Sequence, residues 1–302
     1  MTRRTVAAVT VDGRRLKLTN LEKVLYPAAG VTKAQVLDYY RRIAPYILPH
    51  LAGHPVTMKR YPDGVEHGFF YEKRCPSYRP DWIITKEVPT RSEKPLHFCV
   101  VNDLPTLMWV ANLASIEMHP LLSTADDVQR PTVVAFDLDP GAPADIADCA
   151  RVALDLRKAL GAVGLKGFPK TSGGKGLHFF VPLNTPVTFD ETKHFARAMA
   201  ESYARRNPDT ATSDMKKIGR AGKVFIDWSQ NDSHKTTVAA YSLRARERPT
   251  VSTPVAWKEI EAAAKSRDGS RLQFEIDDVL RRVEAMGDLF EPVLKLKQSL
   301  PR

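Results

Sequence analysis

The sequence predicts an α+β fold built around a mixed or antiparallel sheet. Apolar runs of strand length and amphipathic stretches of helix length both occur, but they do not follow the strict alternation of βαβ units. The chain has 302 residues, 43% of them hydrophobic, which is enough to bury a sizeable core. No stretch approaches the roughly 18 consecutive apolar residues of a membrane span, and the N-terminus lacks the apolar segment of a signal peptide.

No linker rich in proline, glycine and polar residues splits the chain, so one domain is expected over residues 1–302. Within it we expect an N-terminal lobe over about 1–125 and a core lobe over about 126–302. The segment 120–131 is the candidate join between these lobes.

The formal charge of +10 suits a polyanionic partner, although a merely basic protein has the same balance. The three cysteines are scattered, with no CxxC pair or Cys/His cluster, so neither a zinc site nor a disulfide framework is expected. A reducing compartment is the natural interpretation. Basic residues cluster in four segments: 3–17, 58–60, 215–223 and 242–248.

The first helix is expected to begin near Thr32. Thr32 and Gln35 form a capping box ahead of apolar residues at helical spacing, and Pro45 is a candidate kink. The spacing of apolar residues predicts a second helix over 102–119, with His119 at its end.

The other elements follow from the same two patterns, short β-rich runs and apolar residues three or four apart. Strands are predicted within 52–62, 95–101, 132–139, 176–183, 223–229 and 237–244. Helices are predicted over 144–160, 190–206 and the tail 275–300.

The first motif, FDLDP (136–140), places two carboxylates where an apolar strand ends. Asp137 and Asp139 are two residues apart and therefore point to the same face. Like charges this close call for a compensating cation, and paired carboxylates suit Mg²⁺ or Mn²⁺. Two alternatives stay open: a turn-forming Asp pair, and the DxD of haloacid-dehalogenase-type phosphatases with Asp137 as the nucleophile.

The second motif, KTSGGKGLHFF (170–180), contains a glycine-rich loop with a hydroxyl and a cation. Such loops present backbone N–H groups to phosphate oxygens, Lys175 adds charge, and His178 can donate to a phosphate. It is not a Walker A loop, because GxxxxGK[ST] is absent. Taken alone, a glycine-rich turn with a lysine is more often just a turn, and a lone histidine on a strand is more often structural than functional.

The third motif, VFIDWSQND (224–232), ends another apolar strand with Asp227. A two-metal site needs a third carboxylate to complete the metal shells. The alternative is one more carboxylate at a strand end. Lys235 and Arg244 follow as candidates for holding a triphosphate.

Together, three carboxylates at strand ends, a phosphate-cradling loop and flanking cations describe a nucleotidyl-transfer site. Two ions there would activate a 3′-hydroxyl and stabilise the pyrophosphate leaving group. The basic segments would hold the nucleic acid.

The order FDLDP, SGGKGLHFF, DWSQN and AAYSLR resembles the archaeo-eukaryotic primase superfamily and, more closely, the polymerase domain of bacterial DNA ligase D. The resemblance runs from LTNLEKVLYP to GDLFEPVL, and only 71–100 is less familiar. It implies the archaeo-eukaryotic primase fold, with an RRM-like catalytic sheet flanked by helices. It also implies a template-dependent primase-polymerase that fills gaps or extends broken DNA ends in non-homologous end joining and inserts ribonucleotides.

The resemblance assigns roles position by position. The metal ligands would be Asp137, Asp139 and Asp227, holding two Mn²⁺ or Mg²⁺ ions. The nucleotide would be bound by Ser172, Lys175, Gly176, His178, His119, Lys235, Arg244 and Gln230. The DNA would be contacted by Asn20, Lys23 and Lys33 at a 5′-phosphate, and by Lys59, Arg60, Phe70, Tyr71 and Arg220 elsewhere.

The expected partners are DNA with a gap or break carrying a 5′-phosphate and nucleoside or deoxynucleoside triphosphates, with Ku and a DNA ligase raised by the resemblance. A bacterial, cytoplasmic, nucleoid-associated location is expected, with no membrane partner. The chain stops at residue 302 without ligase or nuclease sequence, which fits a stand-alone relative or an excised domain. A metal-dependent phosphatase and a catalytically silent DNA-end-binding module stay open as alternatives.

Overall fold

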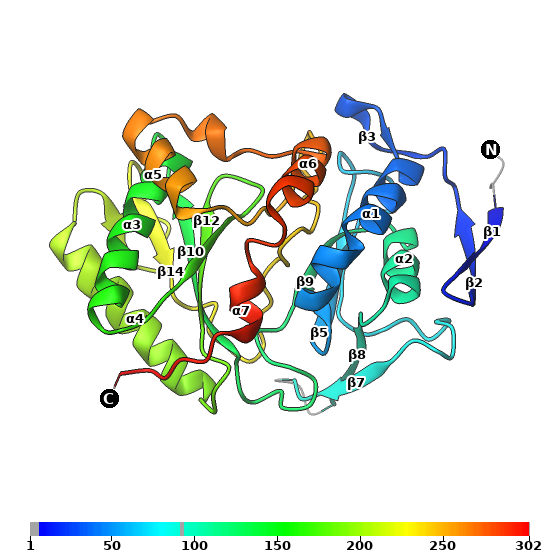
Figure 1. The fold of residues 1–302 in the computed structure, drawn as a ribbon, viewed down its shortest axis with the longest axis horizontal. Coiled ribbons are helices and arrows are strands. Elements are labelled where there is room, and N and C mark those ends of the chain that lie inside the picture. Colours follow the sequence, from blue (N-terminus) through cyan, green and yellow to red (C-terminus); the bar gives the residue numbers. More distant parts are fainter. Residues whose placement is uncertain (1–5, 91–93, 302) are drawn as a thin grey trace. The chain divides into compact units, whose positions relative to one another are not determined.

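The computed structural model describes residues 6–90 and 94–301 and divides into two compact units. Unit 1 consists of 1–121, 236–251 and 275–287, and unit 2 of 122–235, 252–274 and 288–302. The α+β architecture with predominantly antiparallel sheets confirms the predicted fold class. Figure 1 shows the order of the elements along the chain.

Unit 1 holds most of the N-terminal elements. Its helices are α1 (Lys33–Leu51), α2 (Leu104–Asn112) and α6 (Ile276–Met286), with a short 3₁₀ turn at Pro27–Ala29. Its strands are β1 (Val6–Val11), β2 (Arg14–Thr19), β3 (Val24–Tyr26), β4 (Val31–Thr32), β5 (Pro55–Arg60), β6 (Phe70–Glu72), β7 (Thr85–Val88), β8 (Leu96–Val100) and β9 (Ser115–Pro120).

Strand β5 is the centre of the main sheet of unit 1. It pairs antiparallel with β6, β8 and β9, and β7 extends the sheet from β8. The register sets Lys59 opposite both Tyr71 and Glu117, so these three side chains share one face. The neighbouring Arg60 points to the opposite face.

Helix α1 begins as the sequence predicts. The Thr32 hydroxyl accepts a hydrogen bond from the Gln35 backbone N–H, and the Gln35 side chain accepts one from Thr32, which completes the capping box. Pro45 lies inside the helix without ending it, because the helix continues to Leu51. Its apolar face, which includes Val36, is fully buried.

Unit 2 contains one five-stranded sheet and its helices. The strands run in the order β11 (Phe168–Thr171), β12 (Leu177–Pro182), β10 (Val133–Pro140), β14 (Val224–Asp227) and β13 (Ala211–Thr212). All pairs are antiparallel except β13 with β14. The helices are α3 (Ile146–Ala162), α4 (Phe189–Arg206), α5 (Trp257–Ser266) and α7 (Glu291–Lys295), with a 3₁₀ turn at Gly269–Leu272.

The two faces of β10 serve different purposes. Val134, Phe136 and Leu138 are fully buried in the core of unit 2, against which α3 and α4 pack (Figure 1). Asp137 and Asp139 alternate with them and so project from the other face of the sheet. The strand is thus anchored by its apolar residues while its carboxylates stay outside the core.

Three predicted elements are wrong. The helix expected over 102–119 ends at Asn112, Ala114 adopts a left-handed conformation (φ 57°), and β9 follows, so His119 lies on a strand. The strand expected over 237–244 is instead an irregular segment with a left-handed Tyr241. The helical tail is interrupted at Gly287, where a positive φ separates α6 from α7.

The cysteines also differ from expectation. Cys75 and Cys99 form a disulfide with their Cα atoms 4.9 Å apart, whereas the sequence spacing indicated no disulfide. The backbone N–H of Cys75 donates to the carbonyl of His97, which aligns this segment beside β8. Cys149 is a buried free thiol. Across residues 6–90 and 94–301, no helix has the length and apolar character needed to cross a bilayer.

Candidate nucleotidyl-transfer site

A polar row crosses the sheet of unit 2 at the ends of its central strands. Asp137 pairs in register with Asp227 on β14 and with His178 on β12, and His178 pairs with Lys170 on β11. Directly opposed residues of antiparallel strands point to the same face, so all four side chains share it, and Asp139 joins them two residues along β10. The structure therefore brings the three predicted carboxylates together on one sheet face.

Asp227 is held by the turn that follows it. One of its oxygens accepts hydrogen bonds from the backbone N–H and hydroxyl of Ser229, at 2.8 and 2.6 Å, and the other accepts from the Gln230 side chain at 3.0 Å. The ammonium of Lys235 donates to the Ser229 hydroxyl. Three predicted site residues, Asp227, Gln230 and Lys235, thus gather in one turn of unit 2.

The donor set of the row fits a hard divalent cation. Asp137, Asp139 and Asp227 offer carboxylate oxygens, the ligands that Mg²⁺ and Mn²⁺ prefer. Within the described residues no three His, Cys, Asp or Glu side chains converge closely enough to form a metal-coordinating group. The three carboxylates would therefore have to move closer together to share an ion.

The glycine-rich loop is a tight turn between β11 and β12. The Ser172 hydroxyl accepts from the backbone N–H groups of Gly174 and Gly176, at 3.1 and 3.2 Å, and Ser172 N–H donates to the Gly176 carbonyl at 2.9 Å. Lys175 at the tip is exposed. The predicted loop residues therefore lie together, with Ser172 buried at the base of the turn.

Lys170 is a site residue that the sequence analysis missed. It is fully buried, with its ammonium 2.9 Å from His178 Nδ1 and 2.6 Å from the Ser252 hydroxyl. His178 Nε2 lies 3.3 Å from an oxygen of Asp137. The sequence of the hairpin could have indicated Lys170. Lys170 and His178 lie on either side of the glycine-rich loop, and in an antiparallel hairpin they become opposite residues on one face.

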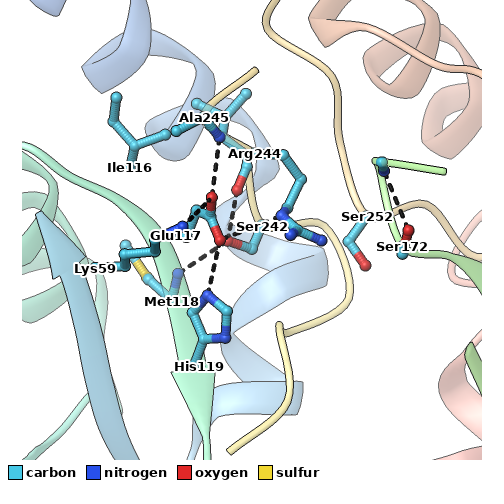
Figure 2. Close-up of polar contacts among 12 residues, drawn as sticks. Lys59, Ile116, Glu117, Met118, His119, Ser172, Ser242, Arg244, Ala245 and Ser252 are labelled. Carbon is cyan, nitrogen blue, oxygen red and sulfur yellow. Dashed lines mark hydrogen bonds and ion pairs between the residues drawn. The ribbon is translucent and has the colours of Figure 1, made fainter. Parts of the chain in front are cut away.

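Three further predicted residues converge within unit 1 on a residue that the sequence analysis did not select. The carboxylate of Glu117 contacts Lys59, His119 and Arg244 (Figure 2). Burial alone would raise the pKa of Glu117, but its hydrogen bond with His119 and the charges of Arg244 and Lys59 outweigh burial and hold the pKa well below its usual range.

The predicted phosphate-binding residues line a pocket of about 690 Å³ in unit 1. Asn20, Lys23 and Lys33 all border it, together with Arg60, which was predicted to contact DNA elsewhere. The Lys33 ammonium is buried and donates to the Thr19 carbonyl at 2.6 Å, whereas Lys23 is partly exposed in an ion pair with Asp63 at 2.7 Å. The pocket also includes Arg15, Lys17, Tyr78, Trp109 and Asn112, which the sequence analysis did not select.

The aromatic pair lies on the outer strand β6 and is exposed, with 44% of Phe70 and 56% of Tyr71 accessible. The guanidinium of Arg60 lies 5.1 Å from the Phe70 ring centre. On the other face, the Lys59 ammonium lies 4.1 Å from the ring of Phe69, a third exposed aromatic residue that the sequence analysis missed. The faces of exposed aromatic rings can stack on unpaired bases.

Arg220 holds its own loop together in unit 2. Its guanidinium donates to the carbonyls of Asp214, Met215 and Lys216 and lies 3.4 Å from the Phe225 ring centre. Phe225 is opposite Asp139 in the β10–β14 pairing. The loop carrying this predicted DNA contact is therefore anchored beside the carboxylate row.

Known proteins agree with this architecture. Residues 32–290 match the family described as LigD, primase-polymerase domain. The multifunctional non-homologous end joining protein LigD of Mycolicibacterium smegmatis is 42% identical over 281 residues, which cover 92% of this chain and 36% of that protein. The bifunctional LigD of Bacillus subtilis is 29% identical over 288 residues, covering 95% of this chain and 45% of that protein.

A solved structure, the polymerase domain of Mycobacterium tuberculosis ligase D in complex with DNA, superimposes with a TM-score of 0.86. It is 38% identical and covers 94% of this chain and 99% of that one. The fold, the family match and the similarity to this solved structure together place the chain in the class of metal-dependent nucleotidyltransferases. The chain belongs to the LigD primase-polymerase domain family.

Proposed function

We propose that the chain is a template-dependent primase-polymerase that fills gaps or extends broken ends during non-homologous end joining. The carboxylate row of Asp137, Asp139 and Asp227 on one sheet face carries this proposal. The names of the relatives support the pathway, although the chain spans 36% and 45% of the length of the two LigD proteins. Residues 1–302 would act as one primase-polymerase domain, with an N-terminal lobe to about residue 125.

The carboxylate row would hold two divalent ions, Mg²⁺ or Mn²⁺. Bound there, the ions would lower the charge on the reacting phosphate and on the leaving pyrophosphate. The side chains of Asp137, Asp139 and Asp227 would fix the ions, and the Ser229–Gln230 turn would orient Asp227. This assignment rests on the residue types and on their shared sheet face.

The remaining contacts would come from the clusters described above. The nucleotide would be bound by Ser172, Lys175, Gly176, His178 and Gln230 with Lys235 in unit 2, and by His119 and Arg244 in unit 1. DNA would contact Lys59, Arg60, Phe70, Tyr71 and Arg220, and its 5′-phosphate would contact Asn20, Lys23 and Lys33. Ku and a DNA ligase are the proposed protein partners, with the nucleoid as the site of action.

Extension of a primer across a short gap tests the proposed function. The full chain is given gapped duplexes with and without a downstream 5′-phosphate, each ion in turn, and both kinds of nucleotide. Template-directed addition supports the proposal. Binding of the duplex without any addition would identify a silent end-binding module, and release of phosphate from a monoester without addition would identify a phosphatase.

Lys23→Ala is expected to weaken binding to a gap carrying a 5′-phosphate by about tenfold, and to a 5′-hydroxyl gap by less than about twofold. A terminal phosphate bears more charge than a diester and therefore gains more from a focused ammonium group. Fluorescence anisotropy on the two matched duplexes measures this difference. Equal losses on both would make Lys23 a general backbone contact.

Lys33→Ala is expected to show the same selectivity, but it needs a stability control. The Lys33 ammonium is buried against Thr19, so its loss also removes internal hydrogen bonds. Thermal unfolding of the variant separates the two effects. Lys73→Ala, an exposed lysine beyond β6, is the matched control that should leave phosphate selectivity unchanged.

Ribonucleoside triphosphates are expected to be used at least as well as deoxyribonucleoside triphosphates. The family resemblance implies it, and no bulky side chain that would exclude a 2′-hydroxyl can be identified in the motifs. A polar partner such as His119 or Ser172 could bond that hydroxyl, and losing the bond costs about 1–3 kcal/mol. Single-nucleotide insertion with ribo- and deoxyribonucleoside triphosphates at equal concentration measures this preference. A tenfold preference for the deoxy sugar would show that a side chain excludes the 2′-hydroxyl.

A further inference from the structure

We propose that Glu117 is a positioning residue that orders the cationic side chains of unit 1 for the incoming nucleotide. This inference rests on the proposed function, because Arg244 and His119 are its nucleotide contacts. Glu117 itself is 1% exposed and is placed to contact protein groups rather than a substrate. Its role would be to fix where the positive charges stand before the nucleotide arrives.

Each oxygen of the Glu117 carboxylate serves a separate set of donors. Oε2 accepts from His119 Nε2 at 2.8 Å and lies 3.2 Å from Arg244 Nε. Oε1 lies 3.4 Å from the Lys59 ammonium and accepts from the Ala245 backbone N–H at 3.1 Å. The bond to Ala245 ties the segment carrying Arg244 to β9, so one carboxylate fixes both the side chain and its backbone (Figure 2).

The charges of this cluster do not cancel. Lys59 and Arg244 carry two positive charges against one negative charge on Glu117, and Arg246 also acts on Lys59. Both paired cations keep 14% of their side chains exposed, whereas the Glu117 side chain keeps 2%. The net positive charge of Lys59 and Arg244 is therefore partly exposed, while the Glu117 carboxylate that holds them is buried. This arrangement suits the binding of a polyphosphate.

Glu117 also sets the tautomer of His119, because its carboxylate can only accept a hydrogen bond from Nε2. Burial lowers the pKa of His119, with the neighbouring carboxylate opposing that shift, so the ring is neutral near pH 7. A neutral ring that donates through Nε2 leaves Nδ1 as an acceptor. His119 is then fixed on three sides, by Glu117, by its place on β9 and by the Tyr71 ring at 6.2 Å.

Removing the carboxylate would leave Lys59 and Arg244 facing each other without a counter-charge. Repulsion would turn both side chains toward solvent, and the nucleotide would then have to order Arg244 on binding. Glu117→Gln keeps the size of the side chain but replaces one acceptor oxygen by an NH₂ group. Lys59, Arg244 and the Ala245 N–H can only donate, so among the partners of Glu117 they offer that NH₂ group no acceptor, and the Tyr61 hydroxyl at 3.5 Å is a long and weak one.

The test compares Glu117→Gln and Glu117→Asp with the full-length wild-type chain. KM and kcat for the nucleotide are measured at saturating gapped DNA, and DNA affinity and the melting temperature are measured alongside. Glu87→Gln is the matched control, because Glu87 is a largely exposed carboxylate on β7 of the same sheet, 3.7 Å from His97. Binding of a fluorescent nucleoside triphosphate is followed separately, since it needs no turnover.

We expect Glu117→Gln to raise KM for the nucleotide by about tenfold or more, with DNA affinity changed less than about threefold, because DNA contacts are spread over many other cations. Glu117→Asp should restore part of the loss, and Glu87→Gln should match the wild type. The positioning role would be overturned by an unchanged KM for the nucleotide. It would also be overturned if Glu117→Gln lost DNA affinity and thermal stability in parallel, without a selective effect on this KM. A wild type that binds the fluorescent nucleotide but adds none would overturn the proposed function, while weaker nucleotide binding by Glu117→Gln would still support the positioning role.

Discussion

Asp227→Ala is expected to lower nucleotide addition by at least about a thousandfold while DNA binding stays within about twofold of the wild type. Asp227 lies opposite Asp137 on the shared face, so its loss removes one of three carboxylates from the row. Without it the ions lose a ligand, and the developing charge on the leaving group loses stabilisation in the transition state. Single-turnover extension of a gapped duplex measures the loss, and anisotropy measures DNA binding.

Asp137→Ala and Asp139→Ala are expected to behave in the same way. Asp190→Ala serves as the matched control, since Asp190 is an exposed carboxylate in the first turn of α4 of the same unit. Melting temperatures guard against misfolding, because the backbone of Ser229 depends on Asp227. Extension at the wild-type rate by Asp227→Ala would remove this residue from the proposed metal ligands.

The sequence was sufficient where function depends on local pattern. The strand ends carrying Asp137 and Asp227 were predicted from apolar runs followed by polar residues, and β14 ends at Asp227 while β10 ends at Pro140, just beyond Asp137 and Asp139. The capping box of Thr32 was equally local. Signals of this kind involve neighbouring residues along the chain, so no knowledge of strand pairing is required.

The sequence was insufficient where function depends on pairing between distant segments. Glu117 looks unremarkable alone, and only the register of β5 with β9 sets it against Lys59. The disulfide was missed for the same reason, because Cys75 and Cys99 come together only when β8 takes its place in the sheet.

One error came from weighing two local signals wrongly. The apolar spacing of 102–119 favoured a helix, yet SIEMH (115–119) alternates between apolar and polar residues, which is typical of a half-buried strand. Ile116 and Met118 are fully buried in the structure, while Glu117 and His119 face the cluster of cations. The strand period was therefore visible in the sequence, and it places the two functional side chains on one face.

Gly176→Ala is expected to lower nucleotide addition by about a hundredfold and to reduce the free energy of unfolding by about 1–3 kcal/mol. A Cβ at this position would lie 2.1 Å from the carbonyl oxygen of Leu138 and 3.4 Å from a carboxylate oxygen of Asp139. The clash is with backbone, so β12 and the glycine-rich loop must move away from β10. Because Leu138 lies between Asp137 and Asp139, that movement displaces the carboxylate row.

The matched control is Gly161→Ala near the end of α3, where a Cβ meets no atom within 4 Å. Alanine favours the helix over glycine, so this variant should be as stable as the wild type or slightly more stable, with unchanged activity. Chemical denaturation gives the stability of both variants, and single-turnover extension gives their activity. If Gly176→Ala loses stability but extends primers at the wild-type rate, the close approach of the loop to β10 supports folding alone. Loss of activity with the predicted loss of stability, and neither in Gly161→Ala, would tie catalysis to the close approach of the glycine-rich loop to β10.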